Sequence, residues 1–171
     1  MRVQQMLAEF PELLNVSYQW NENDRETAIQ AAAQVGSVPV AEFLLARGEP
    51  LEICTAAMLG RKEEVERRLD EDPNEVNSVG AHGIPLLPHA VWSGNLELVQ
   101  LVFGRGATTG ANLALHNSVT KGNSDVTRWI IENARPDVNS KNFQGKTALS
   151  AAKEGKNEKI VEILREHGAL E

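Results

Sequence analysis

A pair of small residues followed by a glycine recurs five times along this 171-residue chain. Measured between Ala32, Ala56, Ala90, Ser118 and Ala152, the steps are 24, 34, 28 and 34 residues. A period in this range is typical of stacked supersecondary units, none of which buries its apolar face alone. The recurrence therefore predicts a solenoid of repeats, and it directs the search for function to a surface.

Each unit contains two short segments with helical character. The first segment begins near Thr27, Pro85, Leu113 or Thr147, and the second follows the glycine as an apolar run spaced i, i+3, i+4. This spacing places the apolar side chains on one face of an amphipathic helix. We expect the small residues where two helices cross, because only a small side chain lets the backbones approach. The pattern predicts an all-α stack of helix–turn–helix units.

A four-residue pattern begins the first segment of three units, and it reads TAIQ at 27–30, LALH at 113–116 and TALS at 147–150. These segments resemble degenerate copies of the T-P-L-H signature of ankyrin repeats. The G-x-T entry at 145–147 and the glycine exit at Gly48 resemble the same family. On this resemblance, the chain from about residue 2 to 171 is identified as a degenerate, bacterial-type ankyrin-repeat protein.

The resemblance implies an all-α, ankyrin-like solenoid with short or partial β-hairpin loops, or fingers, projecting from one edge. We expect a single array over residues 1–171. It would consist of a half repeat with a long loop (1–20) and five repeats at 21–50, 51–80, 81–110, 111–140 and 141–171.

The N-terminal segment looks like the second helix of a repeat, because Val3 and Leu7 recur as Val65 and Leu69 at an offset of 62. Two interpretations are open. Either the start is truncated relative to a longer natural chain, or the half repeat is an atypical cap. We favour truncation, because the apolar side chains would otherwise need a partner helix.

Linker lengths predict which junctions carry a finger. The linkers from Gly48 to Leu51 and from Gly106 to Leu113 are short for a hairpin. The linkers 73–85 and 136–147 have room for a full finger. We therefore expect well-formed fingers at alternate junctions, together with an elongated first finger before Thr27.

The composition and charge of the chain limit the classes of partner that it can bind. A net charge of −7 argues against nucleic acid and disfavours anionic membrane surfaces. The first residues lead into an amphipathic helix rather than a signal peptide, and no apolar run approaches a membrane span. A single cysteine, Cys54, excludes an internal disulfide and fits a reducing compartment. We expect a cytoplasmic, monomeric protein whose partner is another protein.

The residue pattern does not favour catalysis or metal binding. None of the four histidines has a second ligand at metal spacing. We expect no catalytic residue, no cofactor and no metal. The resemblance implies that His116 hydrogen-bonds the backbone across repeats. Cys54 occupies the same slot and is expected to pack as a small, inert apolar group.

Nine residues are candidates for partner binding, since large apolar or aromatic groups on a concave face or a finger tip commonly mark an interface. They form an apolar patch on neighbouring repeats (Met58, Leu59, Ile84 and Trp92) and a set on the fingers (Tyr18, Trp20, Asp24, His82 and Phe143). Two alternatives are open. Trp92 could fold over a neighbouring repeat where a hairpin is missing, and the Tyr18/Trp20 loop could curl back to cap the stack.

The prediction is a non-catalytic module that presents a preorganised concave surface and finger loops to a protein partner. One alternative is a regulatory inhibitor or adaptor of a partner enzyme. The other is a small-molecule-binding enzyme, which would require a deep pocket with perturbed titrating groups.

Overall fold

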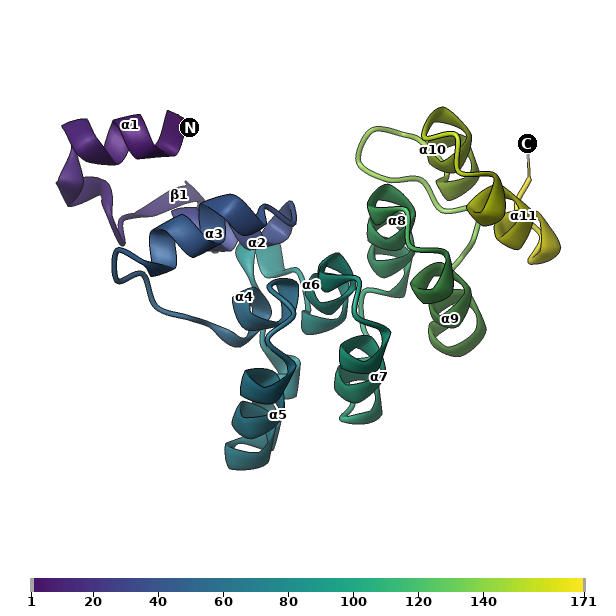
Figure 1. Cartoon of the computed structure of the whole chain (residues 1–171), viewed down its shortest axis with the longest axis horizontal. Coiled ribbons are helices and arrows are strands. Elements are labelled where there is room, and N and C mark those ends of the chain that lie inside the picture. The colour runs from purple at the N-terminus through teal and green to yellow at the C-terminus, as the bar shows by residue number, and fades with distance from the viewer. Residues whose placement is uncertain (1, 171) are drawn as a thin grey trace.

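The computed structural model describes residues 2–170, and a curved row of helix pairs makes up most of them (Figure 1). Helix α1 (Arg2–Glu9) comes first. Five pairs follow, which we call repeats 1 to 5: α2 (Ala28–Gln34) and α3 (Val38–Leu45), α4 (Ile53–Met58) and α5 (Lys62–Glu71), α6 (Leu86–Ser93) and α7 (Leu96–Gly104), α8 (Ala111–Lys121) and α9 (Ser124–Ala134), α10 (Ala148–Glu154) and α11 (Glu158–Glu166). The predicted all-α solenoid is confirmed. The end residues 1 and 171 of the expected array lie outside the described residues.

The first helices of the five pairs pack against one another in sequence order, from α2 to α10. The small residues of the recurring motif belong to these helices, and Ala33, Ala57, Ala90, Ser118 and Ala152 are all buried. Their small side chains allow the close packing that protein interiors require. The expectation that small residues mark helix crossings is confirmed.

The apolar core has two parts. The larger cluster extends from Ile53 to Leu164 through repeats 2 to 5. The smaller cluster lies at the N-terminal end and consists of Ile29, Ala32, Ala33, Ala41, Leu44 and Met58. Val3 and Leu7 of α1 pack against this smaller cluster. The N-terminal helix therefore covers the apolar end of repeat 1.

Fingers form at the junctions that the linker lengths predict. Strands β1 (Ser17–Asn21) and β2 (Asp24–Thr27) form an antiparallel hairpin ahead of repeat 1, with a register irregularity between Gln19 and Asn21. Single bridges close the later fingers, Val79 with Pro85 and Lys141 with Thr147. Short 3-10 helices occupy the remaining linker turns: η1 (Pro11–Leu13), η2 (Pro73–Asn77) and η3 (Ala81–Gly83). The linkers before repeats 2 and 4 have no strand or bridge among the described residues.

Repeat 3 contacts repeat 1 directly, across the junction that lacks a finger. The indole Nε1 of Trp92 donates to the carbonyl of Gln34 at 2.9 Å, and Nδ1 of His89 lies 3.4 Å from the carbonyl oxygen of Ala33. The η3 finger also packs against β2 and α2. The short linker leaves no finger between these segments, so they meet although 56 to 58 residues separate them along the chain.

The ring of Trp92 packs against Gly36, whose backbone has a positive φ of 66°. A Cβ on Gly36 would lie 2.6 Å from Cδ2 of Trp92, closer than two carbon atoms pack. Glycine is needed there both for the left-handed backbone and for the space that the indole occupies.

We predict that Gly36→Ala lowers the free energy of unfolding by about 2–3 kcal/mol, because backbone strain and a steric clash with the indole add together. The matched control is Gly83→Ala, at a φ of 69° with nothing within 4 Å of the position that the new methyl group would take. That variant should lose only about 1 kcal/mol, from backbone strain. Thermal or urea unfolding measures both values. Equal losses would contradict the packing of Trp92 on Gly36.

Candidate functional site

A groove of about 680 Å³ runs across the array and takes its lining from repeats 1, 3, 4 and 5. We call it the groove. Its lining residues are Gln34, Val35, Ile84, Trp92, Asn112, Leu113, His116, Asn117, Thr120, Lys141, Asn142, Phe143 and Gln144. In Figure 1, α6 and α8 lie between α2 on one side and the loop before α10 on the other. The curvature of the stack thus brings the end of α2 and the last finger to one depression.

Five apolar side chains line this groove. Val35 is 62% exposed and Phe143, on the last finger, is 93% exposed. Ile84, Trp92 and Leu113 are half-buried. Three of the nine predicted binding residues, Ile84, Trp92 and Phe143, therefore line one groove, and their role in binding stays a prediction.

The placement of Met58 on an exposed patch is wrong. Its side chain is 0% exposed, and it belongs to the smaller core cluster. All six residues of α4 are buried, because this short helix is packed between α2 and α6. Leu59 is half-buried against the same cluster and does not line the groove. The apolar patch predicted from Met58, Leu59, Ile84 and Trp92 is therefore split between the core and the groove.

Trp92 has two structural roles. Its hydrogen bond to Gln34 and its contact with Gly36 fix the ring against repeat 1. Trp92 therefore folds over another repeat, as the alternative expected, but this is repeat 1 and not a neighbouring repeat. The remaining surface of the half-buried indole lines the groove. The groove consequently has a rigid aromatic wall.

Sequence reasoning missed Val35 and the amide side chains of the groove. Val35 precedes Gly36 as Leu59 precedes Gly60, so the count that selected Leu59 could also have selected Val35. The amides carry no such signal, because their convergence depends on the curvature of the stack.

His116 and Cys54 occupy equivalent positions, and each contacts a carbonyl 24 residues ahead. Nε2 of His116 lies 3.2 Å from the Ser140 oxygen, and Sγ of Cys54 lies 3.8 Å from the Ser78 oxygen. The predicted contact of His116 with a backbone carbonyl is present, but its partner Ser140 is the last residue of the predicted repeat 111–140 and does not belong to another repeat. Burial lowers the pKa of the His116 imidazole and raises the pKa of the Cys54 thiol to about 12. Both groups are therefore neutral near pH 7.

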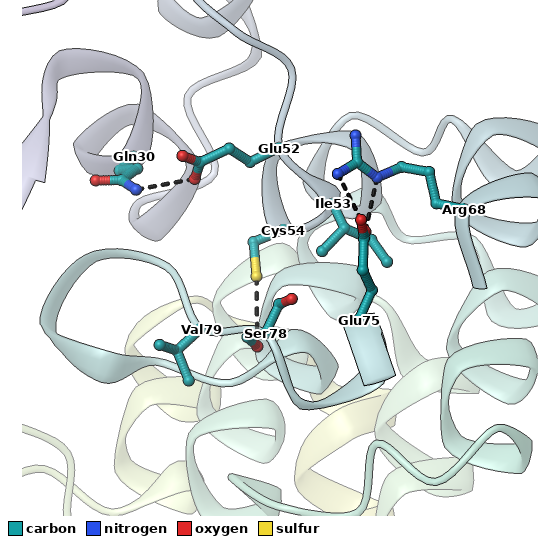
Figure 2. A pocket seen from close by; sticks show the side chains of 8 residues that line it. All are labelled: Gln30, Glu52, Ile53, Cys54, Arg68, Glu75, Ser78 and Val79. Atoms are coloured by element: carbon teal, nitrogen blue, oxygen red, sulfur yellow. Dashed lines mark hydrogen bonds and ion pairs between the residues drawn. The ribbon is translucent and has the colours of Figure 1, made fainter. Parts of the chain in front are cut away.

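A second depression, the polar crevice of about 270 Å³, surrounds Cys54. Figure 2 shows Gln30 facing Glu52 and Arg68 facing Glu75 around it. The guanidinium of Arg68 contacts both oxygens of Glu75 at 2.7 and 2.8 Å, and Gln30 donates to Glu52 at 2.8 Å. Arg68 also donates to the carbonyl of Leu51 at 3.0 Å. The polar side chains of the crevice thus use their hydrogen-bonding groups on one another. We interpret the crevice as a structural contact that links repeat 1 to repeat 2.

The first finger forms a third feature, the hairpin patch, which consists of Tyr18, Trp20, Asp24, Glu26 and His82. Tyr18 and Trp20 are 63% and 56% exposed, with an edge-on ring contact at 4.9 Å. Nδ1 of His82 lies 2.7 Å from Asp24, and Nε2 lies 3.5 Å from Glu26. The indole of Trp20 donates to Glu26 at 2.8 Å. The patch thus joins the first finger to the η3 finger and leaves both aromatic rings open to solvent.

A family model for ankyrin repeats, in three copies, matches residues 87–170. An ankyrin repeat protein of Fowlpox virus (strain NVSL), FPV014, is 33% identical over 106 residues, which cover 58% of this chain and 23% of that protein. The chain belongs to the ankyrin-repeat family. It spans about a quarter of the viral relative. Ankyrin repeats generally mediate protein–protein interaction, and proteins of this family are typically non-catalytic.

Two further observations concern ligands and membranes. Residues 2–170 contain no group of three or more His, Cys, Asp or Glu side chains that could hold a metal ion. None of the helices between these residues has the length and apolar character that a bilayer span requires. The cytoplasmic location, the monomeric state and the bacterial type of the array stay predictions.

We predict that the Cys54 thiol of the folded protein is almost unreactive at pH 8. A thiol with a pKa of about 12 has roughly a thousandfold less thiolate at this pH than a free cysteine, and burial blocks access as well. Labelling with dithionitrobenzoate measures the rate, and the protein unfolded in urea is the control. Equal rates in the two states would contradict the burial of Cys54.

The hairpin patch predicts a pH dependence. The hydrogen bond to Asp24 raises the pKa of His82 above its ordinary value. The contact of protonated His82 with Asp24 therefore stabilises the folded protein fully below pH 6.5. This stabilisation is lost as the pH rises through the raised pKa of His82. Asp24→Asn should return the pKa of His82 toward its ordinary value in an NMR titration.

Thermal unfolding checks the same contact. His82→Ala should lower Tm at pH 5.5 by about 2 °C, and less at pH 8.5, because exposed ion pairs contribute little. A loss of the same size at both pH values would show that charge on His82 does not stabilise the patch.

Proposed function

We propose that this chain is a non-catalytic protein-binding module and that the groove receives a segment of its protein partner. The observation that carries the proposal is the exposure of Phe143 and Val35 in one groove, beside the fixed indole of Trp92. Exposed apolar groups that converge on one depression are characteristic of interaction sites, since a partner removes them from water.

Rigidity supports the same proposal. Trp92 is fixed by a hydrogen bond and by contact with Gly36, and the last finger is closed by the bridge between Lys141 and Thr147. A surface that is ordered before binding loses little conformational entropy on association.

The titratable groups support a non-catalytic role. His89 and His116 are buried and in contact with backbone carbonyls, and burial lowers the pKa of each imidazole. The Cys54 thiol is protonated, and carboxylates such as Glu64 and Glu71 form exposed ion pairs with arginine. A general acid–base pair requires groups whose environments separate their pKa values within a shared site.

The hairpin patch is proposed as an auxiliary contact. Tyr18 and Trp20 present large rings to solvent, and aromatic side chains of this kind are enriched at interfaces. They would touch the partner at the first finger while the groove binds its main segment.

The test compares three proteins in affinity capture followed by titration of the captured partner. These are the wild type, the groove variant Val35→Ser/Phe143→Ser, and the control Val79→Ser/Leu170→Ser, which removes two exposed apolar side chains outside the groove. The groove variant should bind about 30-fold more weakly, as expected when hot-spot contacts of about 2 kcal/mol are lost.

The control variant should bind like the wild type. All three proteins should show the same circular dichroism and nearly the same Tm, because substitutions at exposed positions change stability little. A groove variant that binds the partner as tightly as the wild type would exclude the groove as the binding site.

A further inference from the structure

We propose that the groove is specific for an extended peptide segment that carries apolar side chains and one carboxylate. This inference rests on the proposed function and adds the chemistry of the partner. Three properties of the groove support it: its amide side chains, its single charge and its distribution over four repeats.

Five of the thirteen lining residues carry a primary amide, namely Gln34, Asn112, Asn117, Asn142 and Gln144. A primary amide offers an N–H donor and a C=O acceptor, the same two groups that each peptide unit of an extended chain presents. An amide-rich lining is therefore suited to pairing with the main chain of a peptide.

Two of these amides, Asn112 and Asn142, are held in place by hydrogen bonds that their side-chain oxygens accept. Oδ1 of Asn112 accepts from the Asp137 amide at 2.8 Å, and Oδ1 of Asn142 accepts from the Gln144 and Lys146 amides at 3.0 Å. Within residues 2–170, neither Nδ2 group has an acceptor. Two fixed donors are thus available to peptide carbonyls.

Asn117 is oriented in the opposite sense. Its Nδ2 donates to the carbonyl of Pro88 at 3.1 Å, which leaves its Oδ1 to accept a hydrogen bond. The groove therefore offers both fixed donors and a fixed acceptor, as recognition of a main chain requires. Because the groups are already oriented, binding does not have to order them.

The charge of the groove differs from that of the whole chain. The chain has 24 acidic residues and a net charge of −7, yet no Asp or Glu lines the groove. Lys141 is the single lysine or arginine among the lining residues. It is exposed, and its ammonium has no ion-pair partner among residues 2–170, whereas Lys146 nearby pairs with Glu154 at 2.6 Å.

A carboxylate on the partner would therefore meet Lys141 without facing a carboxylate of the groove wall. A lysine or arginine on the partner would meet an unpaired positive charge instead. Charge complementarity of this kind sets partner preference at an interface. We therefore assign the acidic residue of the peptide to the Lys141 end of the groove.

The shape favours a chain over a compact ligand. The lining comes from repeats 1, 3, 4 and 5. Among the lining residues, the two most exposed apolar side chains are Val35 of repeat 1 and Phe143 of the last finger. A segment that contacts both must cross the array. Small-molecule sites are more often enclosed and bury most of the ligand surface.

The experiment is selection of a phage-displayed library of random 12-residue peptides on the immobilised full chain. Four proteins are compared: the wild type, Lys141→Glu, the control Lys159→Glu, and the groove variant Val35→Ser/Phe143→Ser. Lys159 lies on α11 outside the groove, is exposed and pairs with Asp125, so its substitution makes the same charge change elsewhere.

We expect the wild type and Lys159→Glu to enrich peptides that combine Leu, Ile, Phe or Trp with Asp or Glu. Lys141→Glu should bind these peptides at least about 10-fold more weakly and should enrich peptides with Lys or Arg instead. In NMR spectra, the selected peptide should shift the side-chain amide signals of Asn112 and Asn142 and leave those of Asn74 and Asn95 unchanged.

The outcomes separate this inference from the proposed function. Peptides that require the intact groove but show no acidic preference, or that leave the Asn112 and Asn142 signals unchanged, would overturn this inference alone. Peptides that bind the groove variant as tightly as the wild type would overturn the proposed site as well. A selection that enriches no sequence above the uncoated support would also count against both.

Discussion

Successive first helices pack closely against one another, and the other features of the array follow from this contact. Ala57, Ala90 and Ala114 are fully buried where these helices meet, and larger side chains would separate the repeats. The asparagine side chains that cap two of the second helices add hydrogen bonds to the backbone of the preceding repeat. Asn123 donates to the Gly94 carbonyl at 2.9 Å, and Asn157 donates to the Gly122 carbonyl at 3.3 Å. The row is curved, and its curvature brings the end of α2 and the last finger to one groove (Figure 1).

The linker before repeat 2 has no finger, and this absence affects how repeats 1 and 3 are arranged. Repeats 1 and 3 meet across it through Trp92 on Gly36, and the hairpin meets the η3 finger through Asp24 and His82. The N-terminal part of the array is thus held by contacts that skip a repeat, in addition to contacts between neighbours. The aromatic wall of the groove and the hairpin patch both result from this departure from a regular stack.

The proposed function follows from a contrast in surface chemistry. The exposed faces of the outer helices carry mixed charges that pair with one another, as Arg67 does with Glu64 and Glu71. The groove instead combines exposed apolar side chains, fixed amides and one lysine. A protein surface of this composition is suited to desolvated contact with a peptide, and the polar amides would set its direction and register.

Residue spacing along the chain was sufficient to predict the helix pairs and the placement of fingers, and the family resemblance added the backbone contact of His116. These features depend on distances within one repeat or between neighbouring repeats, so the order of residues specifies them. Which large apolar residues are exposed depends instead on tertiary packing. Met58 is buried because α2 and α6 enclose α4, and Trp92 is fixed because Gly36, 56 residues away, leaves space for its ring. The groove likewise depends on curvature, which accumulates over several repeats and leaves no local pattern at Val35 or at the amides.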